Sequence, residues 1–226
     1  REFTRHALDE IQAGELDRWF TKISPTLHTE ASTHDLGNME HKARSLFLSN
    51  LVSPRPLVML GTKSNDGVRN LAPYTSVSIV ANSPPLAVIS LSVDRDNRIR
   101  DSLANLRENG KAVLNFLQPN QENARLVDQT CKPIPREESE WEAYSIESLD
   151  SNPLIMKNAS MAIEAEVVAE HDLPDAKASL IVLRLGNLIV PGENLPTDSV
   201  HLLCQHGLNR LMATPTAWDY NIESNV

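Results

Sequence analysis

The sequence lacks the features that place a protein in a membrane or outside the cell. No apolar run approaches the about 20 residues that a membrane-spanning helix needs, and the charged stretch 1–9 has no apolar core of a secretory signal. Cysteine is scarce: Cys131 and Cys204 are the two in 226 residues, far apart and in no metal-binding spacing. They could form one disulfide, but we expect two reduced thiols in a soluble cytoplasmic protein.

Basic residues are outnumbered by acidic ones. The chain has 21 Lys and Arg against 30 Asp and Glu, which gives a formal net charge of -9. Neither a nucleic-acid backbone nor an anionic membrane surface attracts such a molecule as a whole, so we expect no partner of either kind. An anionic ligand needs a local basic patch, and the stretch 95–100, with three arginines, is the best candidate.

Motifs for side-chain catalysis and nucleotide binding are also missing. The chain has no G-x-G-x-x-G after a strand, no Walker A loop, and no Ser-His-Asp, Cys-His or paired-carboxylate set that we would assign. His28, His34 and His41 are six and seven residues apart, a spacing that no regular element places on one face. We therefore predict no catalytic side chain and no metal ligand. Any redox chemistry would come from a bound cofactor.

The first half of the chain has a pattern of short strands. Apolar, β-branched runs separated by Asn-Asp-Gly and Asn-Ser-Pro-Pro turn signals predict three of them: 57–60, 74–80 and 86–91. Apolar spacing then predicts one short helix over 100–109, ended by Gly110. Another strand is expected over 112–117.

The second half continues the β pattern. Alternating apolar residues predict a strand over 161–169 with one buried face, and 178–190 predicts a long strand with a bulge at Gly186. Long strands with few crossovers favour an antiparallel barrel, in which closure removes exposed edges. The predicted fold is therefore mainly β with a few helices, and its strands are predominantly antiparallel.

One domain with appendages accommodates a chain of this length. We expect an N-terminal helix and linker (1–43), the barrel (44–192) and a C-terminal arm (193–226). Within the barrel part, 46–52 is a strand or a helix, and 121–130 is a helix.

A polar stretch, 132–151, reads as an excursion over the surface. Such excursions often cover a pocket, and this one carries Trp141 and Tyr144. These aromatic residues either cover a ligand or anchor the loop to its own core.

Between Arg55 and Asn115 the chain carries an ordered series of short elements: Arg55-Pro56, Asp66-Gly67, Asn70-Leu71-Ala72-Pro73-Tyr74-Thr75, Pro84-Pro85, Arg100-Asp101-Ser102, Gly110 and Asn115. The order of these elements resembles that of the flavin reductase-like FMN-binding split barrel family. A looser similarity extends to about Pro191. The resemblance implies a split β-barrel that binds FMN.

Holding the FMN phosphate requires cations and hydrogen-bond donors. Arg100, Asp101 and Ser102 open the predicted helix, which places a cation, a hydroxyl and unpaired N–H groups where a helix N-terminus attracts phosphate. Asp101 could instead serve simply as the N-cap, and this role leaves the phosphate role of the other two intact.

By resemblance, the chain over 72–76 runs along the edge of the flavin ring. Pro73 lacks an N–H, so neighbouring amides and the Thr75 and Ser76 hydroxyls can face the ring. Alternatively, 70–75 is only a bent strand. Ser90 and Ser92 share a strand face, and Ser90 is a candidate for the ribityl chain. The predicted cofactor-binding residues are Asn70, Ala72, Pro73, Tyr74, Thr75, Ser76, Ser90, Arg100, Asp101 and Ser102.

The resemblance implies a homodimer in which hydride passes from NAD(P)H to the flavin, with the nicotinamide stacked on the flavin because no Rossmann site exists. Many reductases of the family carry Gly-Asp-His near the start of the last long strand, whereas this chain reads Asp175-Ala176-Lys177-Ala178-Ser179. This departure bears on hydride transfer rather than on flavin binding. Two alternatives stay open: a flavin-binding barrel without NAD(P)H turnover, as electron carrier, sensor or storage module, and a structural dimer without a ligand.

Overall fold

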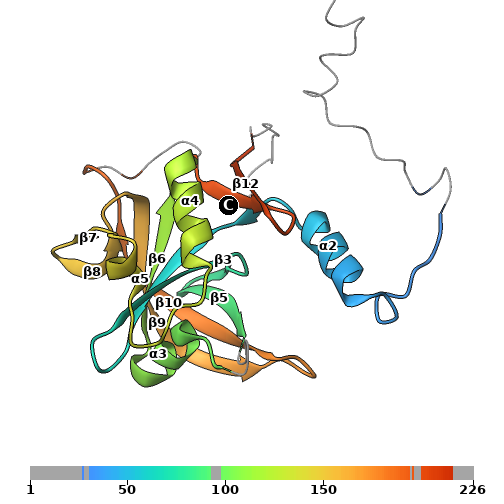
Figure 1. Ribbon diagram of the computed structural model, residues 1–226, viewed down its shortest axis with the longest axis horizontal. Coiled ribbons are helices and arrows are strands. Elements are labelled where there is room, and N and C mark those ends of the chain that lie inside the picture. Colours follow the sequence, from blue (N-terminus) through green and yellow to red (C-terminus); the bar gives the residue numbers. More distant parts are fainter. Residues whose placement is uncertain (1–26, 28–30, 93–97, 194, 196–199, 216–226) are drawn as a thin grey trace, which may run out of the picture. The chain divides into compact units, whose positions relative to one another are not determined.

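The computed structural model describes residues 27, 31–92, 98–193, 195 and 200–215. Contacts within the chain divide it into two units, Arg1–His41 and Lys42–Val226, and the fold reported below is that of the second (Figure 1). The N-terminal helix expected within 1–24, Arg95 and the end of the expected C-terminal arm lie outside the described residues.

Seven strands form one sheet in the order β3-β2-β6-β9-β10-β5-β4, and every neighbouring pair is antiparallel. This confirms the mainly β, antiparallel prediction. No hydrogen-bonded ladder joins β3 to β4 among the described residues, so the sheet keeps two open edges. The strands are β2 (Val58–Lys63), β3 (Arg69–Tyr74), β4 (Ser78–Asn82), β5 (Pro85–Ser92), β6 (Lys111–Leu117), β9 (Ala159–Asp172) and β10 (Ala178–Ile189).

Within the described residues, two smaller sheets and four helices accompany the large sheet. The segment expected to be a C-terminal arm contributes the hairpin of β11 (Leu203–His206) and β12 (Arg210–Ala213), which pairs with β1 (Arg55–Pro56). The other small sheet joins β7 (Ser148–Leu149) to β8 (Asn152–Met156). The helices are α2 (His41–Leu51), α3 (Asp101–Asn109), α4 (Gln121–Thr130) and α5 (Glu140–Ala143).

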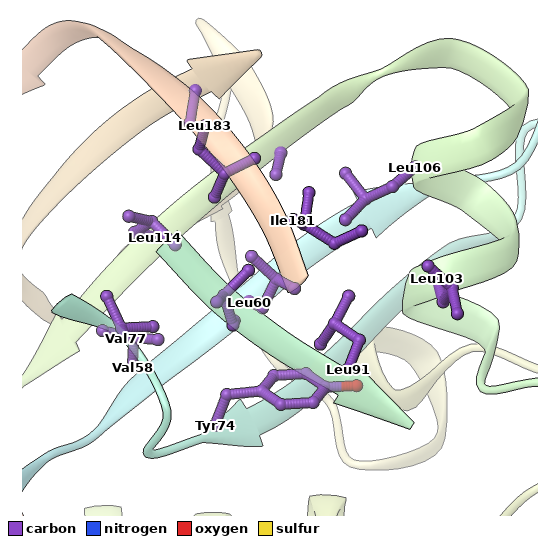
Figure 2. Close-up of a cluster of buried hydrophobic side chains, with 13 residues drawn as sticks. Val58, Leu60, Tyr74, Val77, Leu91, Leu103, Leu106, Leu114, Ile181 and Leu183 are labelled. Carbon is purple, nitrogen blue, oxygen red and sulfur yellow. The ribbon is translucent and has the colours of Figure 1, made fainter. Parts of the chain in front are cut away.

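The main core lies inside the curved sheet. Val58 and Leu60 of β2 point into it, together with apolar side chains from β3, β5, β6, β9, β10 and α3 (Figure 2). Because strands from both halves of the sheet share this core, the sheet wraps around it as an open barrel. Leu57 and Met59 alternate to the opposite face and join a second cluster with Trp141. Burial on both faces explains why 57–60 is a continuous apolar run.

Several sequence expectations are confirmed locally. The predicted helix over 100–109 is α3, and Gly110 ends it with a φ of +70°, a left-handed conformation that suits glycine. A register irregularity between Leu185 and Leu188 contains Gly186, as expected for a bulge. The segment 46–52, left open between strand and helix, is mostly helical, as part of α2.

The prediction of one strand over 74–80 is wrong. β3 ends at Tyr74, the residues 75–77 are not in a strand, and β4 begins at Ser78. The two strands lie at opposite ends of the sheet order, so the chain has to cross the open side of the barrel instead of continuing straight. Val77 turns into the core during this crossing.

The surface excursion over 132–151 is more ordered than expected. It contains α5, and its Trp141 is 1% exposed within the second core cluster. Trp141 is therefore an anchor of the loop, as one of the two alternatives proposed. Its indole also stacks against Arg69, whose guanidinium carbon lies 4.9 Å from the ring centroid.

Candidate cofactor-binding cleft

A cleft of about 390 Å³ brings three distant parts of the chain together. Its walls are β3 from Asn70 to Tyr74, the segment 98–102 at the start of α3, and the segment 130–134 at the end of α4, with Glu140 beside them. Its volume is in the range of small-molecule sites, roughly 300–1,000 Å³. Seven of the ten residues predicted to bind a cofactor line it: Asn70, Ala72, Pro73, Tyr74, Arg100, Asp101 and Ser102.

Thr75, Ser76 and Ser90 are not among the residues that line this cleft. Ser76 instead bridges the open side of the barrel, since its hydroxyl donates to the Ser90 carbonyl (2.9 Å) and accepts from the Ser90 N–H (3.1 Å). These two residues thus lie together and hold the crossing segment to β5. Their contact with a ligand stays a prediction.

The start of α3 presents backbone donors to the cleft. Arg100 occupies the N-cap position with extended backbone (φ −60°, ψ 136°), and no side chain caps the helix. The first N–H groups of a helix have no partner within it, so they are available to an acceptor in the cleft. The prediction that Asp101 is the N-cap is wrong because its carboxylate is held elsewhere.

Two arginines hold the Asp101 carboxylate. Arg98 donates to Oδ2 (2.9 Å) and Arg136 donates to Oδ1 (3.2 Å). Arg98 also donates to the carbonyl of Ile134 (3.1 Å), and Arg136 to Glu108 of α3 (2.6 Å). The negative charge of Asp101 is therefore balanced, and these contacts fasten the 130–136 segment to α3.

Arg100 has no comparable acceptor among the described residues. Its Nε is buried without a hydrogen-bond partner, and its guanidinium carbon lies 5.7 Å from the centroid of the Tyr74 ring. A buried donor without a partner is costly, so the site favours an acceptor that the chain itself does not supply. An anion in the cleft would provide one.

The polar residues of β2, β3 and α3 beside the cleft bond to one another. Asn70 donates to the Ser102 hydroxyl (2.9 Å) and to Thr62 (3.4 Å), and Asn105 also donates to Thr62 (3.2 Å). All four residues are buried. Their burial in apolar surroundings therefore needs no ligand to explain it, although Asn70 and Ser102 still line the cleft. The network fixes β3 against the start of α3.

Tyr74 joins the cleft to the barrel core. Its ring packs at the edge of the main core, with the hydroxyl directed to the side on which α3 lies (Figure 2). Burial raises the pKa of the Tyr74 hydroxyl above its ordinary value, and the neighbouring Ser102 hydroxyl and Arg100 charge lower it by less. Tyr74 therefore stays a neutral hydroxyl at physiological pH.

Sequence reasoning missed Glu140 and the 130–134 wall. Glu140 is 5% exposed, and its Oε2 accepts the N–H of Leu71 on the free edge of β3 (3.0 Å). The contact falls between the cleft residues Asn70 and Ala72. One signal was present: Glu140 directly precedes the buried Trp141, so its position in the fold is fixed by its neighbour.

Charge in the cleft is positive despite the acidic chain. Arg98, Arg100 and Lys132 line it against Asp101 and Glu140, and burial raises the pKa of the Glu140 carboxyl, which favours its neutral form. The region of the expected basic patch thus supplies two of the three cations.

A larger hollow of about 730 Å³ lies over the outer face of β2, β6, β9 and β10. Its central carboxylate, Glu164, already accepts from Asn152 (2.7 Å) and Asn187 (2.8 Å). No buried donor without a partner borders it among the described residues. We therefore favour the smaller cleft as the candidate site.

Residues 51–208 match the family described as "Flavin reductase like domain". The match covers well over half of the chain, and the chain belongs to this family. A relative in Halalkalibacterium halodurans, an uncharacterized protein, is 29% identical over 138 residues, which are 61% of this chain and 65% of the relative. The chain therefore spans less than two thirds of the length of that relative.

Solved structures share the fold. Nitrilotriacetate monooxygenase component B from Bacillus cereus has a TM-score of 0.75 at 18% identity, over 84% of this chain and 99% of the other. A flavin reductase with a split barrel domain from Shewanella frigidimarina has a TM-score of 0.69 at 18% identity, over 83% and 96%. An FMN-binding protein from Thermus thermophilus has 0.61 at 17% identity, over 76% and 93%. The fold is thus a split barrel, as predicted.

The remaining expectations concern the cysteines, membrane spans and the segment 175–179; Cys131 lines the cleft. Cys131 and Cys204 are not joined in a disulfide. None of the described helices has the length and apolar character to cross a bilayer. The segment 175–179, which lacks the family's histidine, does not line the cleft.

Proposed function

We propose that this protein is an FMN-dependent oxidoreductase of the flavin reductase type, which uses NAD(P)H as a transient hydride donor. The observation that carries the proposal is the buried Nε–H of Arg100, which has no hydrogen-bond partner, at the start of α3, where no side chain caps the helix, in the cleft that β3 borders. Membership of the flavin reductase-like family supports a flavin as the ligand.

The donor set suits a phosphate monoester. Arg100, the hydroxyl of Ser102 and the first N–H groups of α3 lie at one end of the cleft, and such groups hold phosphate oxygens well. Arg98 lies beside them, but Asp101 partly balances its charge. One unshared guanidinium fits the single phosphate of FMN better than the pyrophosphate of FAD.

The ring of the flavin would lie along β3. Ala72, Pro73 and Tyr74 line that wall, and they present backbone and apolar surface rather than titratable groups, apart from the neutral Tyr74 hydroxyl. When bound, the flavin accepts the hydride of NAD(P)H and so carries the redox chemistry. The residues of the chain then have to bind, orient and exclude water, which agrees with the absence of a catalytic side chain in the prediction.

Two further parts of the proposal concern assembly and location. Apolar side chains of α2 lie exposed, among them Phe47 (50%) and Leu51 (66%), and such a surface favours burial against a second copy in a homodimer. We place the protein in the cytoplasm, where reduced thiols persist. Sedimentation of the purified chain at several concentrations tests the homodimer, which predicts twice the mass of the chain.

Anaerobic visible spectroscopy tests the reductase proposal. Purified protein supplied with FMN should show the absorption of bound oxidised flavin, and NADH or NADPH should bleach it. If the protein binds FMN but neither nucleotide bleaches the bound flavin, only the flavin-binding part of the proposal stands. The segment 175–179, which lacks the family's histidine, favours this second candidate, an electron carrier, sensor or storage module. A folded protein that takes up no FMN would leave a structural dimer.

A further inference from the structure

Glu140 is a carboxyl group buried at the wall of the candidate cleft. It is 5% exposed and lines the cleft together with Asn70, Tyr74 and Arg100. Its Oε2 accepts the Leu71 N–H at 3.0 Å, which ties the carboxyl to the free edge of β3. Glu140 thus touches the same wall that the ligand would touch.

No cation is bonded to this carboxyl among the described residues. Asp101, in the same cleft, differs because it is held by Arg98 and Arg136. Arg69 lies on β3, the strand that Glu140 contacts, but its guanidinium is bonded to Glu142 and not to Glu140. A buried carboxylate without a cation is expensive, whereas a buried carboxylic acid with a partner for its proton is not.

We propose that Glu140 is a neutral carboxylic acid when the cleft is filled, and that it donates its proton in a hydrogen bond to an acceptor of the ligand. This inference rests on the proposed function, and a ring carbonyl of the flavin is the class of acceptor meant. The Leu71 N–H occupies Oε2, so the acid stays oriented while it donates. Glu140 would then be a ligand-binding residue whose ionisation controls affinity.

The groups around Glu140 act on its pKa in opposite directions, and burial has the largest effect. Burial raises the pKa of the Glu140 carboxyl, the N–H groups of Leu71 and Glu140 itself lower it less, the Asp101 charge raises it, and Arg98 lowers it least. Lys132 also lines the cleft, and Glu142 lies on the same helix. Ionisation of Glu140 at high pH would remove the donor and place a negative charge in the cleft beside the ligand acceptor.

The test is a fluorescence titration of FMN between about pH 5 and pH 9 with wild type and Glu140→Gln. Glutamine accepts from the Leu71 N–H and offers a donor at every pH, but it does not ionise. The FMN phosphate ionises in the same way in both titrations. Its effect on affinity therefore cancels in the ratio of the two Kd values. We expect the wild-type Kd to rise about tenfold relative to Glu140→Gln across the range, the change that one pKa unit represents.

Glu142→Gln is the matched control. It removes the same charge from the same short helix, but Glu142 does not line the cleft. Its Kd ratio to wild type should stay constant with pH. An equal response of Glu142→Gln and Glu140→Gln would overturn the inference, because general charge would then explain it.

Other outcomes separate this inference from the proposed function. If FMN binds and the profiles of wild type and Glu140→Gln are parallel, Glu140 is not a donor but the flavin proposal stands. If folded wild type binds no FMN at any pH, both fail. Should Glu140→Gln not fold, infrared spectra of FMN-bound wild type decide. A protonated carboxyl band near neutral pH, lost on alkalinisation as affinity falls, supports the inference, and its absence refutes it.

Discussion

Replacing Arg100 by methionine tests the assignment of the phosphate end of the cleft. The variant keeps an unbranched apolar stem beside Tyr74 but removes the charge and the donors. The buried Nε–H of Arg100 has no partner, and the neighbouring Asp101 carboxylate is held by Arg98 and Arg136, so the change leaves no buried carboxylate unpaired. The loss should therefore appear in ligand affinity rather than in the fold.

The size of the effect follows from the expected contact. Two unit charges about 4 Å apart interact by about 4 kcal/mol at an effective dielectric constant of 20. Desolvation and competing solvent reduce the net value of a charged hydrogen bond to about 2 kcal/mol, which corresponds to a Kd about 30-fold higher. Added salt should narrow the gap between the proteins, since the cleft is open to solvent screening.

The assay compares FMN with riboflavin, which lacks the phosphate. Fluorescence titration of Arg100→Met should show the roughly 30-fold loss for FMN and nearly unchanged affinity for riboflavin. Arg107→Met is the control, because Arg107 lies on the same helix but bonds Glu170 and does not line the cleft. Equal losses for both ligands in Arg100→Met would refute the reasoning, since Arg100 would then not contact the phosphate.

Three further predictions concern stability. Asn115, fully buried, bonds the carbonyls of Met59 and Leu154 and the N–H of Met156, so Asn115→Ala should lower the unfolding free energy by about 2–4 kcal/mol in urea denaturation; a loss below about 1 kcal/mol would contradict this. Gly110→Ala, at a φ of +70°, should cost about 1 kcal/mol, and an unchanged urea midpoint would argue against the left-handed cap. Because the pKa of the Glu140 carboxyl is raised, Glu140 keeps its proton to a higher pH in the folded chain than in the unfolded chain. The unfolding free energy of wild type, measured by urea denaturation, should thus fall relative to that of Glu140→Gln as pH rises from the ordinary glutamate pKa through the pKa of Glu140 in the folded chain. A difference in unfolding free energy that stays constant across this pH range would reject the prediction.

Much of the fold was predictable because its signals are local. The run over 57–60 is apolar on both faces because β2 is central, and the helix over 100–109 carries its own stop at Gly110. The break between β3 and β4 was not predictable from residue types, since 74–80 is β-prone throughout. Only the position of the two strands at opposite ends of the sheet forces the chain to leave its course.

The candidate site divides in the same way. Its β3 and α3 walls come from short consecutive segments, so their polar residues could be singled out from the sequence. The 130–134 wall and Glu140 come from the end of α4, the start of α5 and the connection between them, which is held to the cleft by contacts of Arg98 and Arg136. The helix N-cap was an open alternative for Asp101 at the start of the predicted helix. In the fold, two arginines compete more strongly for its carboxylate.

A crystal structure of the protein with FMN tests the central claim most directly. We predict the phosphate within hydrogen-bonding distance of the Arg100 guanidinium, the Ser102 hydroxyl and the first N–H groups of α3, with the ring along Ala72, Pro73 and Tyr74. A flavin bound in the larger hollow around Glu164, or a phosphate that leaves Arg100 without an acceptor, would contradict the account.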